Sequence, residues 1–237
     1  MNCNLKQNKR VLFVFSLTLL ALIFGLAVDA NAHGVTAGDK GYIQEIFGFA
    51  PIPFLYLGAK HMITGYDHLL FLVGVIFFLY RLKDVAIYVT LFAVGHIITL
   101  LSGVIFEISV NAYIIDAIIG FSVVYKALDN MGAYQRWFGF QPDTKAATFI
   151  FGLFHGFGLA TKILDYEISE NGLIPNLIFF NIGVEVGQIL ALAVILIAIS
   201  FWRKSSNFLS IAYRANTFIM MLGFLLMGYQ ISGYFIT

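Results

Sequence analysis

The stretch His61-Met-Ile-Thr-Gly-Tyr-Asp-His-Leu-Leu-Phe-Leu-Val-Gly-Val-Ile-Phe-Phe-Leu-Tyr80 decides the fold. It is apolar without interruption after His68, and its 20 residues match the length that a helix needs to cross a bilayer. A run so uniformly apolar is not typical of a barrel strand, in which polar and apolar side chains alternate. The stretch therefore predicts a transmembrane helix that carries two histidines and an aspartate.

Five further stretches have a similar length and composition. They span residues 85–106, 112–127, 146–164, 174–201 and 217–235. Residues 42–59 contain two prolines, and we interpret them as an outer interfacial helix followed by a bend. The sequence thus predicts one all-α domain over residues 33–237, a polytopic membrane bundle of about six transmembrane helices.

The composition of the whole chain agrees with a membrane protein. Of its 237 residues, 60% are hydrophobic and 11% are charged, whereas soluble domains carry about 25% charged residues. The mean hydropathy of +0.87 excludes a soluble globule, a disordered chain and a disulfide scaffold. The net charge of +1 gives no reason to expect a nucleic-acid partner, so the expected surroundings are a lipid bilayer.

The first 32 residues have the pattern of a cleavable signal peptide. Three basic residues precede an apolar run over residues 11–28, and Ala30-Asn31-Ala32 supplies the small residues that signal peptidase requires. The alternative is an uncleaved first helix, because the apolar run is nearly long enough to span. Cleavage would remove Cys3, the only cysteine, so thiolate metal sites and disulfides are not expected in residues 33–237.

Basic residues in the short loops predict the orientation. If residue 33 emerges on the outer side, the inner loops carry eight basic residues: Arg81, Lys83, Lys126, Arg136, Lys145, Arg203, Lys204 and Arg214. The outer side carries three, which are Lys40, Lys60 and Lys162. The charge bias and the signal peptide both predict a multi-pass protein of the bacterial inner (plasma) membrane, with both mature termini on the periplasmic side.

A weak internal repeat is also visible. Gly65-x-x-His68 recurs as Gly152-x-x-His155, and Phe92-x-x-Gly95 recurs as Phe180-x-x-Gly183, at offsets of 87 and 88 residues. These offsets relate the first predicted helix to the fourth and the second to the fifth. A three-helix unit repeated once must enter the membrane from opposite sides, as in the inverted repeats of transporters.

Polar side chains inside the predicted spans mark the candidate site. A charged side chain at the centre of a membrane helix costs about 2.5–3.5 kcal/mol on insertion scales, so such residues usually face a bundle interior and have a function. Four of the five histidines lie in these spans. The candidates for metal handling are His61, Asp67, His68, His96, His155 and Glu185, with Thr99, Asp116, Asn181 and Gln188 as further polar residues of the spans.

The spacing of His61 and His68 leaves two possibilities open. Seven residues correspond to about 10.5 Å along a straight helix, too far for two ligands that each lie about 2.0–2.1 Å from one ion. Either Gly65 breaks the helix, or His61 meets the metal first and His68 belongs to a deeper site. Glu185 has three possible roles that the sequence does not separate: a metal ligand, a proton carrier or a structural partner of His96.

Four ordered segments carry a resemblance to a known family. They are His61-x5-Asp67-His68, residues 92–100 around His96, residues 154–158 around His155 and residues 180–188 around Glu185. Together they resemble the HupE/UreJ family of bacterial membrane proteins, which is linked to nickel supply for hydrogenase and urease. The resemblance covers essentially the whole mature chain.

One departure from that family follows His155. The hydrogenase-linked members carry Phe-His-Gly-x-x-His-Gly-x-Glu, whereas here Leu159 stands at the second histidine and Lys162 at the glutamate. This segment fits the UreJ-like branch better.

The resemblance implies a nickel or cobalt permease in which His61, Asp67, His68 and His155 handle the metal. We therefore expect uptake of a divalent transition metal from the periplasm to the cytoplasm, with nickel first and cobalt, copper or zinc as alternatives. No tightly bound cofactor is expected, and the maturation machinery of nickel enzymes is an expected partner. Because no Gly-x4-Gly-Lys-Ser/Thr motif occurs, the energy must come from a gradient or from capture in the cytoplasm.

Two other classes of function stay open. Three histidines and an aspartate in a helical bundle could hold zinc and activate a water, as in an intramembrane metal hydrolase, although no His-Glu-x-x-His motif is present. The other class is a metal-binding accessory protein without transport. The loops of under about 21 residues argue against it, because they leave little soluble surface on which a partner protein could dock. We expect a permease and no enzymatic activity.

Overall fold

The chain folds as an all-α bundle in the part that the computed structural model describes, residues 42–79, 81–165 and 169–236. Within these residues most positions are helical and none lies in a strand, which confirms the predicted fold class. The predicted signal peptide and its cleavage site lie outside the described residues.

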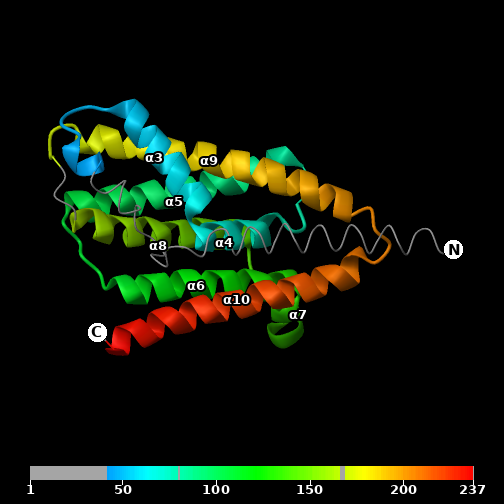
Figure 1. The fold of residues 1–237 in the computed structure, drawn as a ribbon. Helices are drawn as coiled ribbons and strands as arrows, with labels where there is room; N and C mark the ends of the chain where they lie inside the picture. The colour runs from blue at the N-terminus through cyan, green and yellow to red at the C-terminus, as the bar shows by residue number, and fades with distance from the viewer. Residues whose placement is uncertain (1–41, 80, 166–168, 237) are drawn as a thin grey trace.

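The first predicted span, residues 61–80, contains the end of one helix and the whole of a second. α3 runs over Pro51–Thr64 and α4 over Tyr66–Ile76, and Gly65 between them has extended backbone with φ −73° and ψ 99°. The prediction of one helix over residues 61–80 is therefore wrong. α4 is almost completely buried and lies near the centre of the bundle (Figure 1).

The stretch over residues 42–59 also differs from its prediction. Residues 42–45 are helical and a bend follows, but a helix begins again at Pro51, inside that stretch. Proline suits the first helical position because the N–H that it lacks would have no partner there. The prolines therefore begin α3, and the predicted bend comes before them.

The other predicted spans each correspond to one helix. These are α5 (Leu82–Ile105), α6 (Ala112–Asn130), α8 (Thr144–Leu164), α9 (Leu173–Trp202) and α10 (Phe208–Ile236). Only the start of α10 lies far from its prediction, nine residues earlier in the chain. The prediction also missed α7 (Ala133–Phe138), a short helix between two glycines with positive φ.

Side-chain caps fix the starts of two of these helices. Asn111 accepts a hydrogen bond from the backbone N–H of Ile114 at the start of α6, at 3.2 Å. Asp143 accepts from the N–H groups of Lys145 and Ala146 at the start of α8, at 2.7 and 3.2 Å. Each cap satisfies a backbone donor that has no partner within its own helix.

Four helices among the described residues are long and apolar enough to cross a membrane: α5, α8, α9 and α10. In Figure 1, α7 and the turn from α9 to α10 lie at one end of the bundle, and α10 finishes at the other end. This arrangement agrees with a chain that crosses the membrane several times. Its orientation in the membrane stays a prediction.

Several helix pairs touch through glycines at backbone-to-backbone distance, and two of them, α3 with α9 and α5 with α8, position the candidate site. Between α3 and α9, a Cβ added to Gly58 would overlap the carbonyl of Phe180, and one added to Gly183 would overlap that of Leu55. Between α5 and α8, a Cβ on Gly152 would overlap the carbonyl of Phe92 in the same way. Small residues allow the helices to approach this closely. In lipid no hydrophobic effect drives helices together, and close packing stabilises the pair instead.

The two glycine contacts repeat the same pattern. Phe92-x-x-Gly95 on α5 packs against Gly152-x-x-His155 on α8, and Phe180-x-x-Gly183 on α9 packs against Gly58-x-x-His61 on α3. By packing, the counterpart of the α8 segment is therefore Gly58-x-x-His61 and not Gly65-x-x-His68, as the sequence offsets suggested. The two helix pairs, α5 with α8 and α9 with α3, therefore pack through the same arrangement of Phe-x-x-Gly against Gly-x-x-His.

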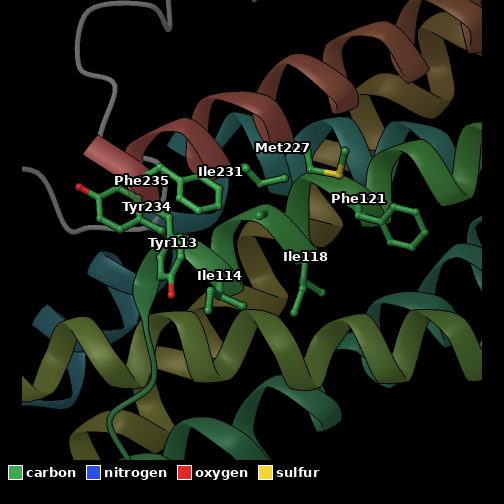
Figure 2. Close-up of a pocket in the computed structure, with 9 residues that line it drawn as sticks. Tyr113, Ile114, Ile118, Phe121, Met227, Ile231, Tyr234 and Phe235 are labelled. Carbon is green, nitrogen blue, oxygen red and sulfur yellow. The ribbon is translucent and has the colours of Figure 1, made fainter. Parts of the chain in front are cut away.

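A shallow groove lies on the outside of the bundle between α6 and α10. Figure 2 shows side chains of both helices along it, and its lining consists of Tyr113, Ile114, Ala117, Ile118, Phe121, Met227, Ile231, Tyr234 and Phe235. Apart from two tyrosine hydroxyls this lining is apolar, and it offers no imidazole or carboxylate. Such a surface is typical of contact with lipid, and the candidate site lies elsewhere.

Candidate metal site

The helix break at Gly65 brings His61 and His68 together. Their ring centroids lie 5.0 Å apart, and both side chains are buried. A straight helix would separate the two residues by about 10.5 Å along its axis. Of the two possibilities that the spacing left open, a break at Gly65 is confirmed.

A third imidazole comes from α8. The ring centroid of His155 lies 4.7 Å from that of His68, and His155 is completely buried. The neighbouring Gly156 lets α8 lie close against α5, because a Cβ there would overlap the carbonyl of His96. His61, His68 and His155 thus form a row of three imidazoles from α3, α4 and α8, which we call the imidazole row.

Asp67 orients His68. One carboxylate oxygen, Oδ1, lies 2.9 Å from Nδ1 of His68 and accepts a second bond from the backbone N–H of His68, also at 2.9 Å. A carboxylate that holds the Nδ1–H leaves the lone pair of the imidazole on Nε2. Histidines that bind metals commonly have such a partner on the other ring nitrogen.

A backbone carbonyl fixes the same tautomer in His155. Nδ1 of His155 lies 2.7 Å from the carbonyl oxygen of Phe151, one turn earlier in α8. A carbonyl oxygen can only accept a hydrogen bond, so Nδ1 carries the proton. The lone pair of His155 therefore also lies on Nε2.

His96 on α5 is held by a side-chain amide of α9. Its Nδ1 donates to Oδ1 of Asn181 at 2.8 Å, and Nδ2 of Asn181 donates to the carbonyl of Ala93 at 3.4 Å. The second bond places the amide nitrogen of Asn181 toward Ala93 and its oxygen toward His96. Nδ1 of His96 must therefore carry the proton, and its lone pair also lies on Nε2. Phe92 separates His96 from the imidazole row, with ring centroids 6.2 Å from His96 and 4.8 Å from His155.

Aromatic rings enclose the imidazoles. Phe180 packs against His61 with centroids 5.6 Å apart, and Phe71 packs against His155 at 6.2 Å. Phe71, Phe92 and Phe180 are all buried. An apolar shell of this kind limits the access of water and tunes the ligands that it surrounds.

The imidazole row is looser than a closed coordination sphere. Among the described residues, no three His, Cys, Asp or Glu side chains are arranged to hold one metal ion as they stand. Structural zinc sites hold four ligands at about 2.0–2.3 Å from the ion. Binding an ion between these rings would therefore require them to move closer together.

The other polar residues of the spans lie around this group. Glu185 accepts a hydrogen bond from the hydroxyl of Thr90 on α5, at 2.8 Å, so the predicted option that it is the structural partner of His96 is wrong. Asp116 forms an ion pair with Lys162 at 3.2 Å. Gln188 is fully buried, and its amide has no hydrogen-bond partner among the described residues.

Thr99 ties α5 to α8. Its hydroxyl donates to the carbonyl of Leu153 at 2.6 Å.

Sequence reasoning missed what holds the histidines in place. The roles of Asn181 as acceptor for His96 and of the Phe151 carbonyl as acceptor for His155 were not predicted. The first had a signal, because Asn181 shares a face of α9 with two other polar residues at i+4 and i+7. The second had none, since any residue supplies a carbonyl.

Comparison with known proteins gives one match. The family model described as HupE / UreJ protein matches residues 37–237, which include all of the helices described above. Neither a curated protein nor a solved structure matches the chain. The matched range covers most of the sequence and the whole candidate site, and the chain therefore belongs to the HupE/UreJ family.

Proposed function

We propose that this protein is a membrane permease for the uptake of a divalent transition metal ion, with nickel as the first candidate and cobalt, copper or zinc as alternatives. Its family is associated with the uptake of nickel or cobalt. Imidazole nitrogen is a ligand that suits all four of these metals. A mature chain without cysteine would offer the ion nitrogen and oxygen ligands only.

The observation that carries the proposal is the common tautomer of the histidines. In His68, His96 and His155, the Nδ1–H is held by a carboxylate, an amide oxygen and a carbonyl oxygen, respectively. Each ring is thereby prepared to offer Nε2 to a metal. Metal-binding histidines commonly have one ring nitrogen held in this way while the other faces the ion, so three rings with the same nitrogen engaged favour metal handling.

The loose spacing of the rings supports transport over permanent binding. An ion that moves through a protein must be held well enough to enter and weakly enough to leave. In this scheme the metal meets His61 and the Asp67–His68 pair first, and then passes His155 and His96. The scheme includes passage from the periplasm to the cytoplasm across the inner membrane, delivery to the maturation machinery of nickel enzymes, and no catalytic step.

A radiometal uptake panel tests this proposal. We expect metal-starved cells that make the wild-type protein to accumulate one of nickel, cobalt, zinc or copper selectively, and His68→Ala to abolish the accumulation. His33→Ala is the matched control, because it makes the same change outside the matched residues 37–237. Absence of uptake of all four metals would sink the permease, and stoichiometric binding without uptake would favour a metal hydrolase or an accessory protein.

Asp67 gives a second prediction. Replacing it with alanine should lower the metal affinity of the purified protein by about 10- to 100-fold, because His68 loses the carboxylate that fixes its tautomer. Asp67→Asn should lose less affinity, since its amide oxygen can still accept from Nδ1. Equilibrium binding of radioactive nickel measures both, and equal affinity in the alanine variant and the wild type would contradict the orienting role.

A further inference from the structure

The ion pair between Asp116 and Lys162 joins α6 to α8 inside the bundle. Nζ of Lys162 lies 3.2 Å from Oδ2 of Asp116. The side chain of Asp116 is 7% exposed and that of Lys162 is 18% exposed. Moving two charges out of water is costly, and charged residues retained inside a membrane protein usually have a function. The path proposed above for the metal makes no use of this pair.

Lys162 lies beyond the imidazole row on the same face of α8 as His155. Seven residues separate the two, which corresponds to about 10.5 Å along the helix. His68 of α4 packs against His155. One turn further along α4, Phe71 packs against Phe151, one turn back along α8. The two helices are therefore antiparallel, and the step from His155 to Lys162 leads past the start of α4 to the break before it.

Asp116 lies at the same level on α6. The end of α6 meets the start of α8, where the hydroxyl of Thr144 donates to Asp129 at 3.1 Å, so α6 is also antiparallel to α8. α4 and α6 therefore run in the same direction. Gly74 of α4 lies against Lys126 of α6. Ten residues before each of these, Asp116 on α6 corresponds to position 64, where α3 ends and the break begins.

Lys162 brings a positive charge close to the candidate site. Its charge acts on His61, Asp67 and His68, which agrees with a place beside the break. Lys162 also lies in the last turn of α8, where the helix dipole favours a cation. A divalent ion that arrives at the imidazole row therefore binds against the repulsion of this ammonium group.

We propose that Lys162 is a built-in competitor of the metal ion. Its ammonium group lowers the affinity of the imidazole row for a divalent cation. The carboxylate of Asp116 acts in the opposite direction, because it supplies negative charge that offsets the ammonium group. The pair thereby keeps the ion bound weakly enough to leave. This inference deepens the proposed function and rests on one part of it, the binding of a divalent ion at the imidazole row.

The test measures the equilibrium affinity of the purified full chain for radioactive Ni²⁺ in detergent. Lys162→Met removes the charge and keeps the length of the side chain. It should raise the affinity about tenfold, since a unit charge at this range opposes a divalent ion by that order in a partly solvated site. Asp116→Asn removes the negative partner and should lower the affinity by a similar factor. Lys162→Arg keeps the charge and should bind Ni²⁺ as the wild type does.

Lys145→Met is the matched control for Lys162→Met. Lys145 is exposed in the first turn of the same helix, about 25 Å from Lys162 along the axis. At about 0.15 M salt, an exposed charge so far away is largely screened. This variant should therefore keep the affinity of the wild type.

The double variant Lys162→Met/Asp116→Asn keeps the test valid where a single variant is unstable. A charge left without its partner inside the bundle destabilises the fold, whereas the double variant carries neither charge. It should bind Ni²⁺ about as tightly as the wild type and about tenfold more tightly than Asp116→Asn. Thermal unfolding of each variant separates stability from affinity. A purely structural ion pair would lower Tm in both single variants without changing their affinities in opposite directions.

The outcomes separate this inference from the proposed function. Lys162→Met that binds Ni²⁺ no more tightly than the wild type overturns this inference and leaves the proposed function standing. The same conclusion follows if the double variant binds no more tightly than Asp116→Asn. A wild type that binds none of the four metals overturns the proposed function and this inference together.

Discussion

Replacing Gly65 with alanine is expected to lower metal affinity by about 10- to 100-fold while the protein stays folded. The backbone of Gly65, with φ −73° and ψ 99°, is open to any L-residue, so the substitution causes no backbone strain. The difficulty is the added Cβ. It would lie 2.5 Å from Nδ1 of His68 and 3.2 Å from Oδ1 of Asp67, the two atoms of the orienting hydrogen bond.

This expectation is checked by radioactive nickel binding and by thermal unfolding of the same purified variant. If Gly65→Ala acts by displacing the Asp67–His68 hydrogen bond, the double variant with Asp67→Ala should lose little more affinity than either single variant. Non-additivity of this kind identifies two changes that act on one interaction. Wild-type affinity in Gly65→Ala would show that the position of Nδ1 is not critical.

The second large effect is expected on stability, at Gly58. Alanine there should destabilise the protein by about 3 kcal/mol, the upper end for overpacking, because the new methyl group overlaps the backbone carbonyl of Phe180. Neither α3 nor α9 can yield by rotating a side chain, since the collision is with backbone. For a domain of this size the loss corresponds to a fall in Tm of roughly 6–12 °C.

Gly228→Ala is the matched control for Gly58→Ala. Gly228 lies inside α10, and an added Cβ there would meet nothing within 4 Å. The same substitution should leave Tm unchanged or raise it slightly, because alanine restricts the unfolded chain more than glycine does. Unfolding of both variants in detergent, followed by circular dichroism, makes the comparison. Equal Tm values would show that α3 and α9 separate without cost.

Much of the fold could be predicted because lipid permits few alternatives. Long apolar stretches in a bilayer must be helices, and five of the six predicted spans correspond to one helix each. The break at Gly65 was foreseen only as one of two options. A glycine inside an apolar run does not by itself end a helix, and the close pairing of His61 with His68 became visible only in three dimensions. α7 has six residues, too few to show a periodic pattern.

The chemistry of the site could be predicted in part, for a related reason. Histidines and carboxylates are costly in membrane spans, so their presence singled them out. What they contact depends on how the helices rotate and pack. Glu185 and Asn181 lie on one face of α9 by sequence, yet one meets Thr90 and the other His96. A four-residue step turns a helix by about 40° beyond one full turn, enough to change neighbours.

The interruption at Gly65 also has an electrostatic consequence. α3 ends and α4 begins beside the imidazole row, so two half-helices present opposite ends of their dipoles there. The carboxyl-terminal end of α3 carries roughly half a negative charge and attracts a cation, whereas the amino-terminal end of α4 carries a similar positive charge and repels one. Asp67, in the first turn of α4, supplies the negative charge that offsets the repelling end. The two half-helix ends largely cancel, and an arriving metal ion therefore meets a field in its favour that comes mainly from the carboxylate of Asp67.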